Sequence, residues 1–414
     1  MRLPTLRVPE HRVTTRHSPS AYPFQCQPGL PQAGPLVGHD LLSGGAMFCY
    51  DPWYLYQRGI IQSPNAIVLG KIGKGKSSLV KTYLLRQFVF GRGIYVMDPK
   101  GEYEPLAREL GIPFVRLEPG GTVRVNPLDP GQLTDPGAIA RQRGELTIGL
   151  CESALRRPLS PAEASTLDAA LAELRREATL ADLLECFEHP TVEMARAVNT
   201  TVGDLAGIAV ELAHVVRRML TGALAGMFDG PTNIDLSGTD RGLVVDISAL
   251  QDKDAFELVM VCASSWLTSV TAIRDARRRI LCLDELWRTL NAGVAITRWL
   301  QSVAKLARSL GVSLVLVTHN LSDMVAQASD GAEAMKQALG LLASCETVIA
   351  YNQDSKEAGN LQDLLGLSER EALEITELDA YHGFWRVGSH VAIVRHFLDA
   401  SERELVDTNM AMVA

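Results

Sequence analysis

Short runs of apolar residues alternate along most of this chain with longer stretches in which apolar positions recur every three or four residues. The short runs are typical of buried strands, and the longer stretches are typical of amphipathic helices. Apolar runs of strand length occupy residues 66–69, 93–97, 114–117, 242–247, 279–283, 312–317 and 347–351. This alternation predicts an α/β fold, in which helices flank a mostly parallel sheet.

The pattern changes between residues 131 and 225. Alanine, leucine, glutamate and arginine become frequent there, and no strand-like run appears. Ser160 and Glu163 form a capping-box pattern, which marks the start of a helix. Amphipathic helices are expected at 161–176, 179–187 and 191–220. We therefore expect an all-helical insertion that divides the α/β domain into residues 65–130 and 226–400, and such a unit more often binds partners than carries out chemistry.

The two ends of the chain differ from the α/β part. Residues 1–64 are rich in Pro, Gly, His and Gln and have few periodic apolar positions, so we expect an extended arm. Its aromatic part, residues 47–54, docks either on the chain's own core or on a neighbouring subunit, and the first option is favoured. Residues 383–388 and 390–395 alternate like two paired strands. The polar tail, 401–414, is expected to fray.

Composition narrows the class of protein. A chain of 414 residues with 47% hydrophobic and 21% charged residues is globular and long enough for a second domain. The net charge of −8 argues against wholesale coating of nucleic acid, although it does not exclude a local basic channel. The 7 cysteines form no C-x-x-C pair, which indicates reduced thiols in a cytoplasm and no metal site among them. Charges flank or interrupt the most apolar window, 255–273, so we expect no membrane span.

A glycine-rich stretch after the first strand carries the clearest chemical signal. GKIGKGKS, from Gly70 to Ser77, fits G-x-x-x-x-G-K-[ST] between a strand and a helix, the context of a phosphate-binding loop. Its glycines let consecutive amides converge on phosphate oxygens, and the helix that opens at about Lys76 adds its positive end. Lys76 is expected to reach the β- and γ-phosphates, and Ser77 to ligate Mg²⁺. The expected ATP-binding residues are Gly70, Lys71, Ile72, Gly73, Lys74, Gly75, Lys76, Ser77 and Ser78.

Acidic residues follow two other strands. Asp284 and Glu285 end the apolar run at 279–283. Beside a phosphate loop, Asp284 is expected to hold Mg²⁺ through its water shell, and Glu285 to act as general base. Asp98 and Glu102 follow the run at 93–97, where open α/β sheets bind ligands, which places them near the nucleotide or a coupling surface. An ordinary Pro-Gly turn with solvated charges is an equally good interpretation of these two residues.

His319 follows the strand at 312–317. If that strand lies beside the strand of the phosphate loop, the imidazole faces the γ-phosphate and can sense hydrolysis. A capping or merely hydrogen-bonded histidine remains the alternative.

The order of these motifs resembles one family. The phosphate loop, DPKGEY, NPLD, the helical insertion, LCLDELW and LVLVTHN together resemble the TraC-like type IV secretion and conjugative-transfer ATPases, which belong to the FtsK/HerA class of RecA-like motors. The likeness spans roughly residues 45–400. It implies a RecA-like P-loop ATPase that works as a homo-oligomeric ring, a hexamer, with ATP and Mg²⁺ between subunits. It also implies that Lys76 and Ser77 bind phosphate and Mg²⁺, and that Asp284 and Glu285 are the Walker B pair.

Three departures from the family pattern bear on mechanism. Thr318 is followed by His319, where the family has Thr-Gln. An arginine common after the late strand is replaced by Asn352. The family's large N-terminal domain has no counterpart before residue 65, which puts the usual mode of membrane and channel docking in question.

A RecA-like ring needs an arginine from the next subunit at the transferring phosphoryl group. Arg308 matches a recurrent family arginine and is our first choice, and Arg386 is the second. A plain surface salt bridge is as good an interpretation of either residue. The arginines at 274 and 277–279 are interpreted as the end of a long predicted helix, 253–279, rather than as a DNA contact.

Three functional hypotheses follow. The first is a motor that energises substrate transfer or machine assembly together with membrane-embedded secretion or conjugation components, located in the cytoplasm or peripherally at the inner face of the membrane. The second is a double-stranded DNA translocase of the same class. The third is a nucleotide-gated assembly scaffold with negligible turnover, which the departures at His319 and Asn352 keep open.

Overall fold

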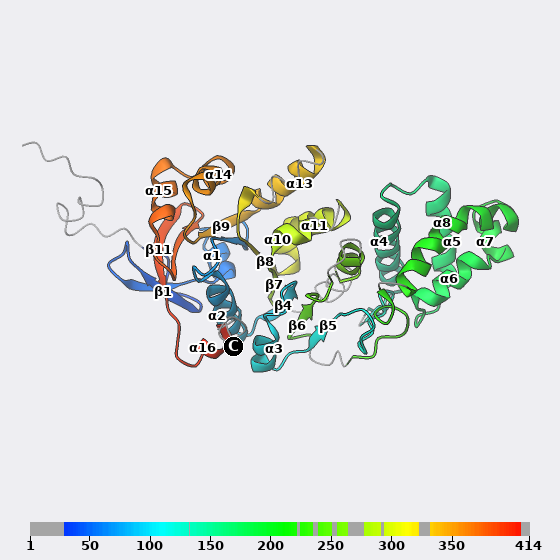
Figure 1. The fold of residues 1–414 in the computed structure, drawn as a ribbon, viewed down its shortest axis with the longest axis horizontal. Helices are drawn as coiled ribbons and strands as arrows, with labels where there is room; N and C mark the ends of the chain where they lie inside the picture. The colour runs from blue at the N-terminus through cyan, green and yellow to red at the C-terminus, as the bar shows by residue number, and fades with distance from the viewer. Residues whose placement is uncertain are drawn as a thin grey trace, which may run out of the picture.

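The computed structural model describes residues 29–131, 133–221, 224–234, 239–250, 255–263, 277–290, 294–322 and 332–406. An 11-stranded sheet forms its centre, with the strand order β2-β1-β11-β10-β9-β3-β8-β7-β4-β6-β5 (Figure 1). The strands are β1 (Leu36–Asp40), β2 (Ala46–Cys49), β3 (Asn65–Leu69), β4 (Gly93–Asp98), β5 (Phe114–Arg116), β6 (Gly242–Asp246), β7 (Arg279–Leu283), β8 (Val312–Thr318), β9 (Cys345–Ala350), β10 (His382–Val387) and β11 (His390–His396). Pairing is parallel from β9 to β5 and antiparallel from β9 to β2, which confirms the mostly parallel sheet.

Helices cover both faces of the sheet. They are α1 (Pro52–Gln57), α2 (Lys76–Val89), α3 (Glu104–Leu110), α10 (Leu286–Leu290), α11 (Val294–Leu310), α13 (Ala332–Ala343), α14 (Ser355–Leu365), α15 (Glu369–Glu377) and α16 (Arg403–Val406). Successive strand residues enter opposite faces, so Ile67 and Leu69 join one hydrophobic cluster and Val68 joins the other. Helices α2 and α3 cover the face of Val68. The buried strands are therefore apolar on both sides, as the sequence pattern required.

The helical insertion lies between β5 and β6. It consists of α4 (Pro136–Leu155), α5 (Pro161–Glu173), α6 (Leu180–Glu188), α7 (Val192–Ala197) and α8 (Val202–Leu220), and Figure 1 shows it in green at the right of the view. Ser160 and Glu163 form both hydrogen bonds of the expected capping box at the start of α5. The stretch predicted as one helix over 191–220 is two helices, because Thr201 caps a new start at Val202.

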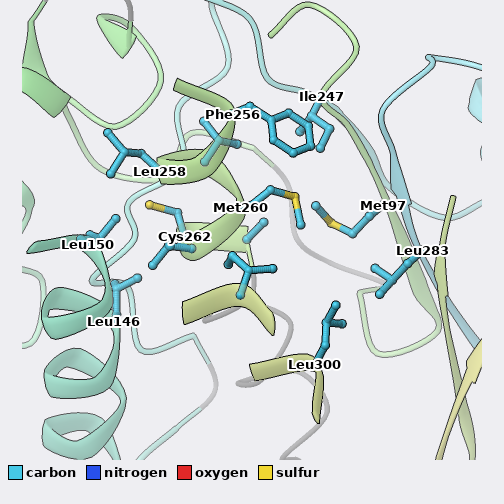
Figure 2. Close-up of a cluster of buried hydrophobic side chains, with 14 of the residues drawn as sticks. Met97, Leu146, Leu150, Ile247, Phe256, Leu258, Met260, Cys262, Leu283 and Leu300 are labelled. Atoms are coloured by element: carbon cyan, nitrogen blue, oxygen red, sulfur yellow. The ribbon is translucent and has the colours of Figure 1, made fainter. Parts of the chain in front are cut away.

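A buried layer joins the insertion to the sheet. Residues 255–263 are helical and lie between α4 and the strands (Figure 2). Leu258 and Cys262 face Leu150 of α4, whereas Met260 faces Met97 of β4, and all these side chains are buried. One continuous apolar core therefore joins α4 to the sheet.

The structure corrects the predicted arm. Residues 36–57 form β1, β2 and α1, and β1 pairs with β11, with Gly38 opposite His396. Phe48 and Tyr50 pack edge-on against Trp385 at ring-centroid distances of 5.0 and 5.3 Å, which confirms docking on the chain's own core. Both strands are short, and β1 contains Gly, His and Asp, so they show no clear period in the sequence. Residues 1–28 of the predicted arm lie outside the described residues.

Two further predictions need revision. Of the helix predicted over 253–279, only 255–263 is described as helical, and Arg279 begins β7 rather than ending a helix. Arg274 lies outside the described residues.

In the tail, α16 packs against α2, and Glu402 binds Arg86 at 2.6 Å, so residues 401–406 are anchored rather than frayed. Among the described residues, no helix combines the length and apolarity needed to cross a membrane.

Candidate nucleotide-binding site

The expected site residues meet because parallel strands end at one edge of the sheet. Strand β3, which leads into the glycine loop, pairs with β8 on one side and β9 on the other. Strand β7 follows β8, and β4 follows β7. The loop therefore lies beside His319, and Asp284 and Glu285 are one strand further, followed by Asp98. The expected role of His319 depended on β8 lying beside β3, and the two strands are neighbours.

The glycines of the loop are required by its shape. Gly70 has φ of 147°, and a Cβ there would lie 2.5 Å from the Cβ of Tyr351. Gly75 has φ of 107°, and a Cβ there would lie 3.0 Å from Cδ1 of Tyr381. A residue with a side chain would be strained at either position, and it would crowd Tyr351 after β9 or Tyr381 before β10.

Helix α2 begins at Lys76, as expected, and leaves its first amides available. Its N-cap is Gly75, which has no side chain to accept a hydrogen bond from the first turn. The first amides of a helix have no partner within the helix. The loop therefore presents a helix N-terminus with a lysine at its first position, a combination that suits a phosphate group.

The Lys76 ammonium is held inside the loop. Its Nζ donates to the carbonyl oxygens of Gly70 and, at 3.0 Å, Lys71, and lies 2.9 Å from Nδ1 of His319. Burial and the charge of Lys100 lower the pKa of Lys76 to about 8, against the opposing effect of Asp284 and Glu285. A bound anion would restore the charged form of this lysine.

His319 connects Lys76 to Glu285. Its Nε2 lies 2.8 Å from Oε1 of Glu285. A charged Lys76 can only donate to Nδ1, so Nε2 carries the proton and donates to the carboxylate. The neutral Nε2–H tautomer therefore satisfies both contacts. The histidine thus links the glycine loop to the acidic residues that follow β7.

Glu285 is buried and held in an unusual backbone conformation. Its φ is 48°, in the left-handed region that non-glycine residues seldom adopt. Trp287 Nε1 donates to Oε2, so the carboxylate is held on both oxygens. Burial raises the pKa of Glu285, but the hydrogen bonds from His319 and Lys100 outweigh it and hold the pKa at about 2. In this state the carboxylate is charged and weakly basic.

Lys100 is a site residue that the sequence reasoning missed. Its ammonium forms an ion pair with Oε1 of Glu285, and Nζ lies 3.4 Å from Nε2 of His319. Burial lowers the pKa of Lys100, but the charges of Asp284 and Glu285 outweigh this and raise it. The sequence did contain a usable signal. Lys100 lies two residues beyond β4, and it comes to lie near Asp284 and Glu285, just beyond β7, because β4 and β7 are neighbouring strands.

Asp98 orders the turn after β4. Its carboxylate accepts hydrogen bonds from the amides of Lys100, Gly101 and Tyr103 at 3.0, 2.8 and 2.8 Å. The residue is fully buried, so it is not the solvated charge of the alternative interpretation. Burial raises the pKa of Asp98 to about 6, despite those hydrogen bonds. Asp98 thereby positions Lys100, while Glu102 lies half-buried with Oε2 free of any hydrogen bond in the described chain.

Asp284 and Ser77 supply oxygen ligands suited to Mg²⁺. Asp284 is buried and accepts hydrogen bonds from Tyr103 Oη at 3.2 Å and from the Glu285 amide at 2.9 Å. Within the described ranges, no cluster of three or more His, Cys, Asp or Glu side chains is arranged around a possible metal position. An ion here would take only one or two ligands from the chain and the rest from water and phosphate, as Mg²⁺ does.

The β9 side of the loop is fixed by amides. Asn352, at the position where the family has an arginine, donates Nδ2 to the carbonyls of Thr376 and Leu378, at 2.8 and 3.1 Å. The backbone carbonyl of Asn352 accepts a hydrogen bond from the backbone amide of Lys71 at 3.1 Å. Gln353 donates to the carbonyl of His319 at 2.7 Å. Asn352 and Gln353 therefore hold the glycine loop and the end of β8 against the segment that follows β9.

The two candidate arginines lie apart from this network. Arg308 is exposed in the last turn of α11, near the amino end of β8, whereas the glycine loop lies beyond the carboxyl ends of the strands. Arg386 donates to the carbonyls of Leu365 and Gly366, at 2.6 and 3.2 Å, and so binds the C-terminal end of α14. Neither reaches the site of its own chain.

Comparison with known proteins identifies the fold. No family model and no curated protein sequence matches the chain. Among solved structures, VirB4 of Thermoanaerobacter pseudethanolicus matches with a TM-score of 0.69 at 21% identity, over 91% of this chain and 100% of that one. The fold is that of VirB4. The bacterial conjugative coupling protein TrwB matches with a TM-score of 0.57 at 12% identity, over 90% of this chain and 89% of that one.

These likenesses concern the fold, so the resemblance inferred from the motifs is confirmed at the level of the fold. TrwB has also been solved with the ATP analogue ADPNP, and that structure matches with a TM-score of 0.56 at 17% identity, over 83% of this chain and 87% of that one. A further TrwB structure, in complex with ADP and Mg²⁺, covers 81% of this chain and 86% of that one, with a TM-score of 0.56 at 16% identity.

Proposed function

We propose that this protein is an ATP-hydrolysing motor of a conjugative-transfer or type IV-like secretion system. The observation that carries the proposal is the hydrogen-bonded series Lys76–His319–Glu285, which spans the glycine loop, β8 and β7. It joins a phosphate-binding lysine to a general base on adjacent strands, as nucleotide hydrolysis requires. The fold of VirB4 and of the conjugative protein TrwB supports the assignment to this class of machine.

ATP and Mg²⁺ are the proposed cofactors. The amides of residues 70–78 and the Lys76 ammonium hold the phosphates, while Ser77 and Asp284 hold Mg²⁺, which neutralises charge on the phosphate oxygens. Lys76 leaves its partners in the loop when it binds phosphate. His319 then loses one contact and keeps the other, so it reports nucleotide occupancy to Glu285.

The ion pair between Lys100 and Glu285 predicts low basal turnover. A general base works best when its pKa is near the working pH, and the pKa of Glu285 is held at about 2. We propose that Lys100 moves away before Glu285 accepts a proton from water, which removes one of the two hydrogen bonds that lower the pKa of Glu285. We propose that closure of a subunit interface in a hexameric ring, with an arginine supplied in trans by Arg308 or Arg386, brings about this rearrangement.

The helical insertion is the proposed output. It packs on residues 255–263, which pack on Met97 of β4, so a shift of the Asp98 turn and of Glu102 is transmitted to α4 through the buried layer. Its partners would be membrane-embedded secretion or conjugation components, with the protein at the inner face of the membrane. DNA is the proposed substrate only if it stimulates turnover.

The scaffold function is a second candidate because Lys100 forms an ion pair with Glu285 in this structure. In that case ATP binding would reorganise Lys76 and His319, while Lys100 stays on Glu285 and turnover remains negligible.

The proposal is tested by measuring ATP hydrolysis of the purified protein with and without double-stranded DNA, together with its mass in solution with ATP. A ring-sized species with turnover that ignores DNA supports a secretion motor. Stimulation by DNA supports a translocase, and ATP binding without turnover under either condition supports the scaffold.

A further inference from the structure

Tyr381 is an aromatic residue beside the glycine loop with no part in the network described above. It lies between α15 and β10 and is 46% exposed. Its ring and backbone contact the loop at Gly75, since a Cβ on that glycine would lie 3.0 Å from Cδ1 and 3.3 Å from Cα of Tyr381. An exposed ring thus lies against the residue that precedes Lys76 and the first turn of α2.

The backbone of Tyr381 is held in a costly conformation. Its φ is 62°, in the left-handed region, which non-glycine residues seldom adopt because of the steric cost. Its amide donates to the carbonyl of Lys74 at 2.9 Å, and its carbonyl accepts from the His396 amide at 2.8 Å. His396 Nε2 in turn lies 2.9 Å from the hydroxyl of Thr82 on α2. The glycine loop and β11 therefore fix the backbone of Tyr381 from both sides.

The arrangement of charges fixes the direction of a bound nucleotide. The groups that suit the reacting phosphate, Lys76, His319 and Glu285, lie toward β8 and β7. A nucleoside triphosphate lying along the loop must then place its nucleoside on the opposite side, toward β9 and β10. Tyr351, after β9, also lies near Gly75 but is buried, whereas Tyr381 is exposed on that side.

We propose that Tyr381 is the stacking platform for the nucleobase of the bound nucleoside triphosphate, an inference that rests on the proposed function. Every base has a π-face, so stacking adds affinity without selecting among bases. The protein would then accept ATP and GTP with similar affinity. Because the loop and β11 fix the backbone of Tyr381 before the base arrives, the backbone entropy lost on binding is reduced.

The test compares ligands with and without a base. Binding of Mg²⁺–ATP, Mg²⁺–GTP and Mg²⁺–tripolyphosphate to the full chain is measured by calorimetry, for the wild type and for Tyr381→Phe, Tyr381→Ala and Tyr381→Gly. Tyr381→Gly removes the ring and also relieves the left-handed strain, so it separates loss of stacking from loss of fold. Tyr56→Ala, which removes another exposed tyrosine, is the matched control.

The proposal predicts that Tyr381→Ala and Tyr381→Gly weaken ATP and GTP binding by about tenfold or more, the size of one base–aromatic stack. Tyr381→Phe and Tyr56→Ala should bind like the wild type, and tripolyphosphate binding should not change in any variant. Equal ATP affinity in the wild type and Tyr381→Gly would overturn the proposal, as would an equal loss for tripolyphosphate. If the wild type binds none of the three ligands, the proposed function itself fails.

Discussion

The imidazole Nε2 of His319 lies 2.8 Å from Oε1 of Glu285, so the residue that departs from the family pattern contacts the proposed general base directly. Its other nitrogen faces Lys76 at 2.9 Å. A glutamine could make the same two contacts, because its carbonyl oxygen accepts from lysine and its amide donates to the carboxylate. The family's Thr-Gln and this chain's Thr-His are thus two solutions to one hydrogen-bonding requirement.

Replacing His319 tests this equivalence. We expect His319→Gln to keep kcat for ATP within a few-fold of the wild type, and His319→Ala to lower it about 100-fold, a typical loss for a group that orients a catalytic base. Steady-state hydrolysis at saturating ATP measures both. Wild-type turnover in His319→Ala would show that the imidazole is only a structural group.

Lys76 should take up a proton when nucleotide binds at alkaline pH. Its pKa of about 8 without ligand lies below the usual value for lysine, so the side chain is charged below that pH and neutral above it, and bound phosphate raises the pKa again. Uptake by this lysine should be near zero at about pH 6.5, about half a proton at about pH 8 and nearly one proton at about pH 9. Calorimetry in buffers of different ionisation enthalpy measures it. Uptake that does not change over this range would contradict the lowered pKa.

The buried layer of Figure 2 should be essential to stability. Leu150 is 2% exposed on α4, so Leu150→Ala should lower the free energy of unfolding by about 2–5 kcal/mol, through lost burial and the cavity left behind. Leu373→Ala on α15 makes the same change at a residue that is 59% exposed, and should cost no more than about 0.5 kcal/mol. Denaturant unfolding of the two variants makes the comparison. Similar costs would mean that α4 is not firmly packed on the sheet.

The two candidate arginines should behave differently. Arg308 is exposed, so Arg308→Ala should leave the free energy of unfolding unchanged and lower kcat about 1,000-fold if its guanidinium acts in trans. Arg386→Ala should instead cost about 1–2 kcal/mol, because its guanidinium binds the end of α14. Mixing Arg308→Ala with Glu285→Gln subunits should restore part of the activity. Wild-type kcat in Arg308→Ala alone would remove Arg308 from the mechanism. An inactive Arg308→Ala whose activity does not recover in the mixture would rule out action in trans.

The parallel part of the sheet and the glycine loop could be predicted from the sequence because each depends on local signals. Apolar runs define the strands, and the spacing of Gly70, Gly75, Lys76 and Ser77 defines the loop. Strand β1 could not be predicted, because its place in the sheet is fixed by pairing with β11, more than 350 residues later in the chain. Pairing of that range leaves no mark on local periodicity.

The same limit applies to the site. Lys100 was not predicted because its importance depends on β4 lying beside β7, which brings its ammonium to Glu285. Tyr381 was not predicted because its contact with Gly75 depends on the fold of the C-terminal hairpin. The motifs predict which groups bind phosphate. Lys100 and Tyr381 lie in segments that only the folded chain brings next to those groups.

The most direct test of the central claim is ATP binding and hydrolysis measured side by side in the wild type, Lys76→Ala and Glu285→Gln. If the series from the loop to the base is catalytic, Lys76→Ala should lose both binding and turnover. Glu285→Gln should bind ATP like the wild type and turn over at least about 100-fold more slowly. Turnover in Glu285→Gln equal to that of an active wild type would contradict the account.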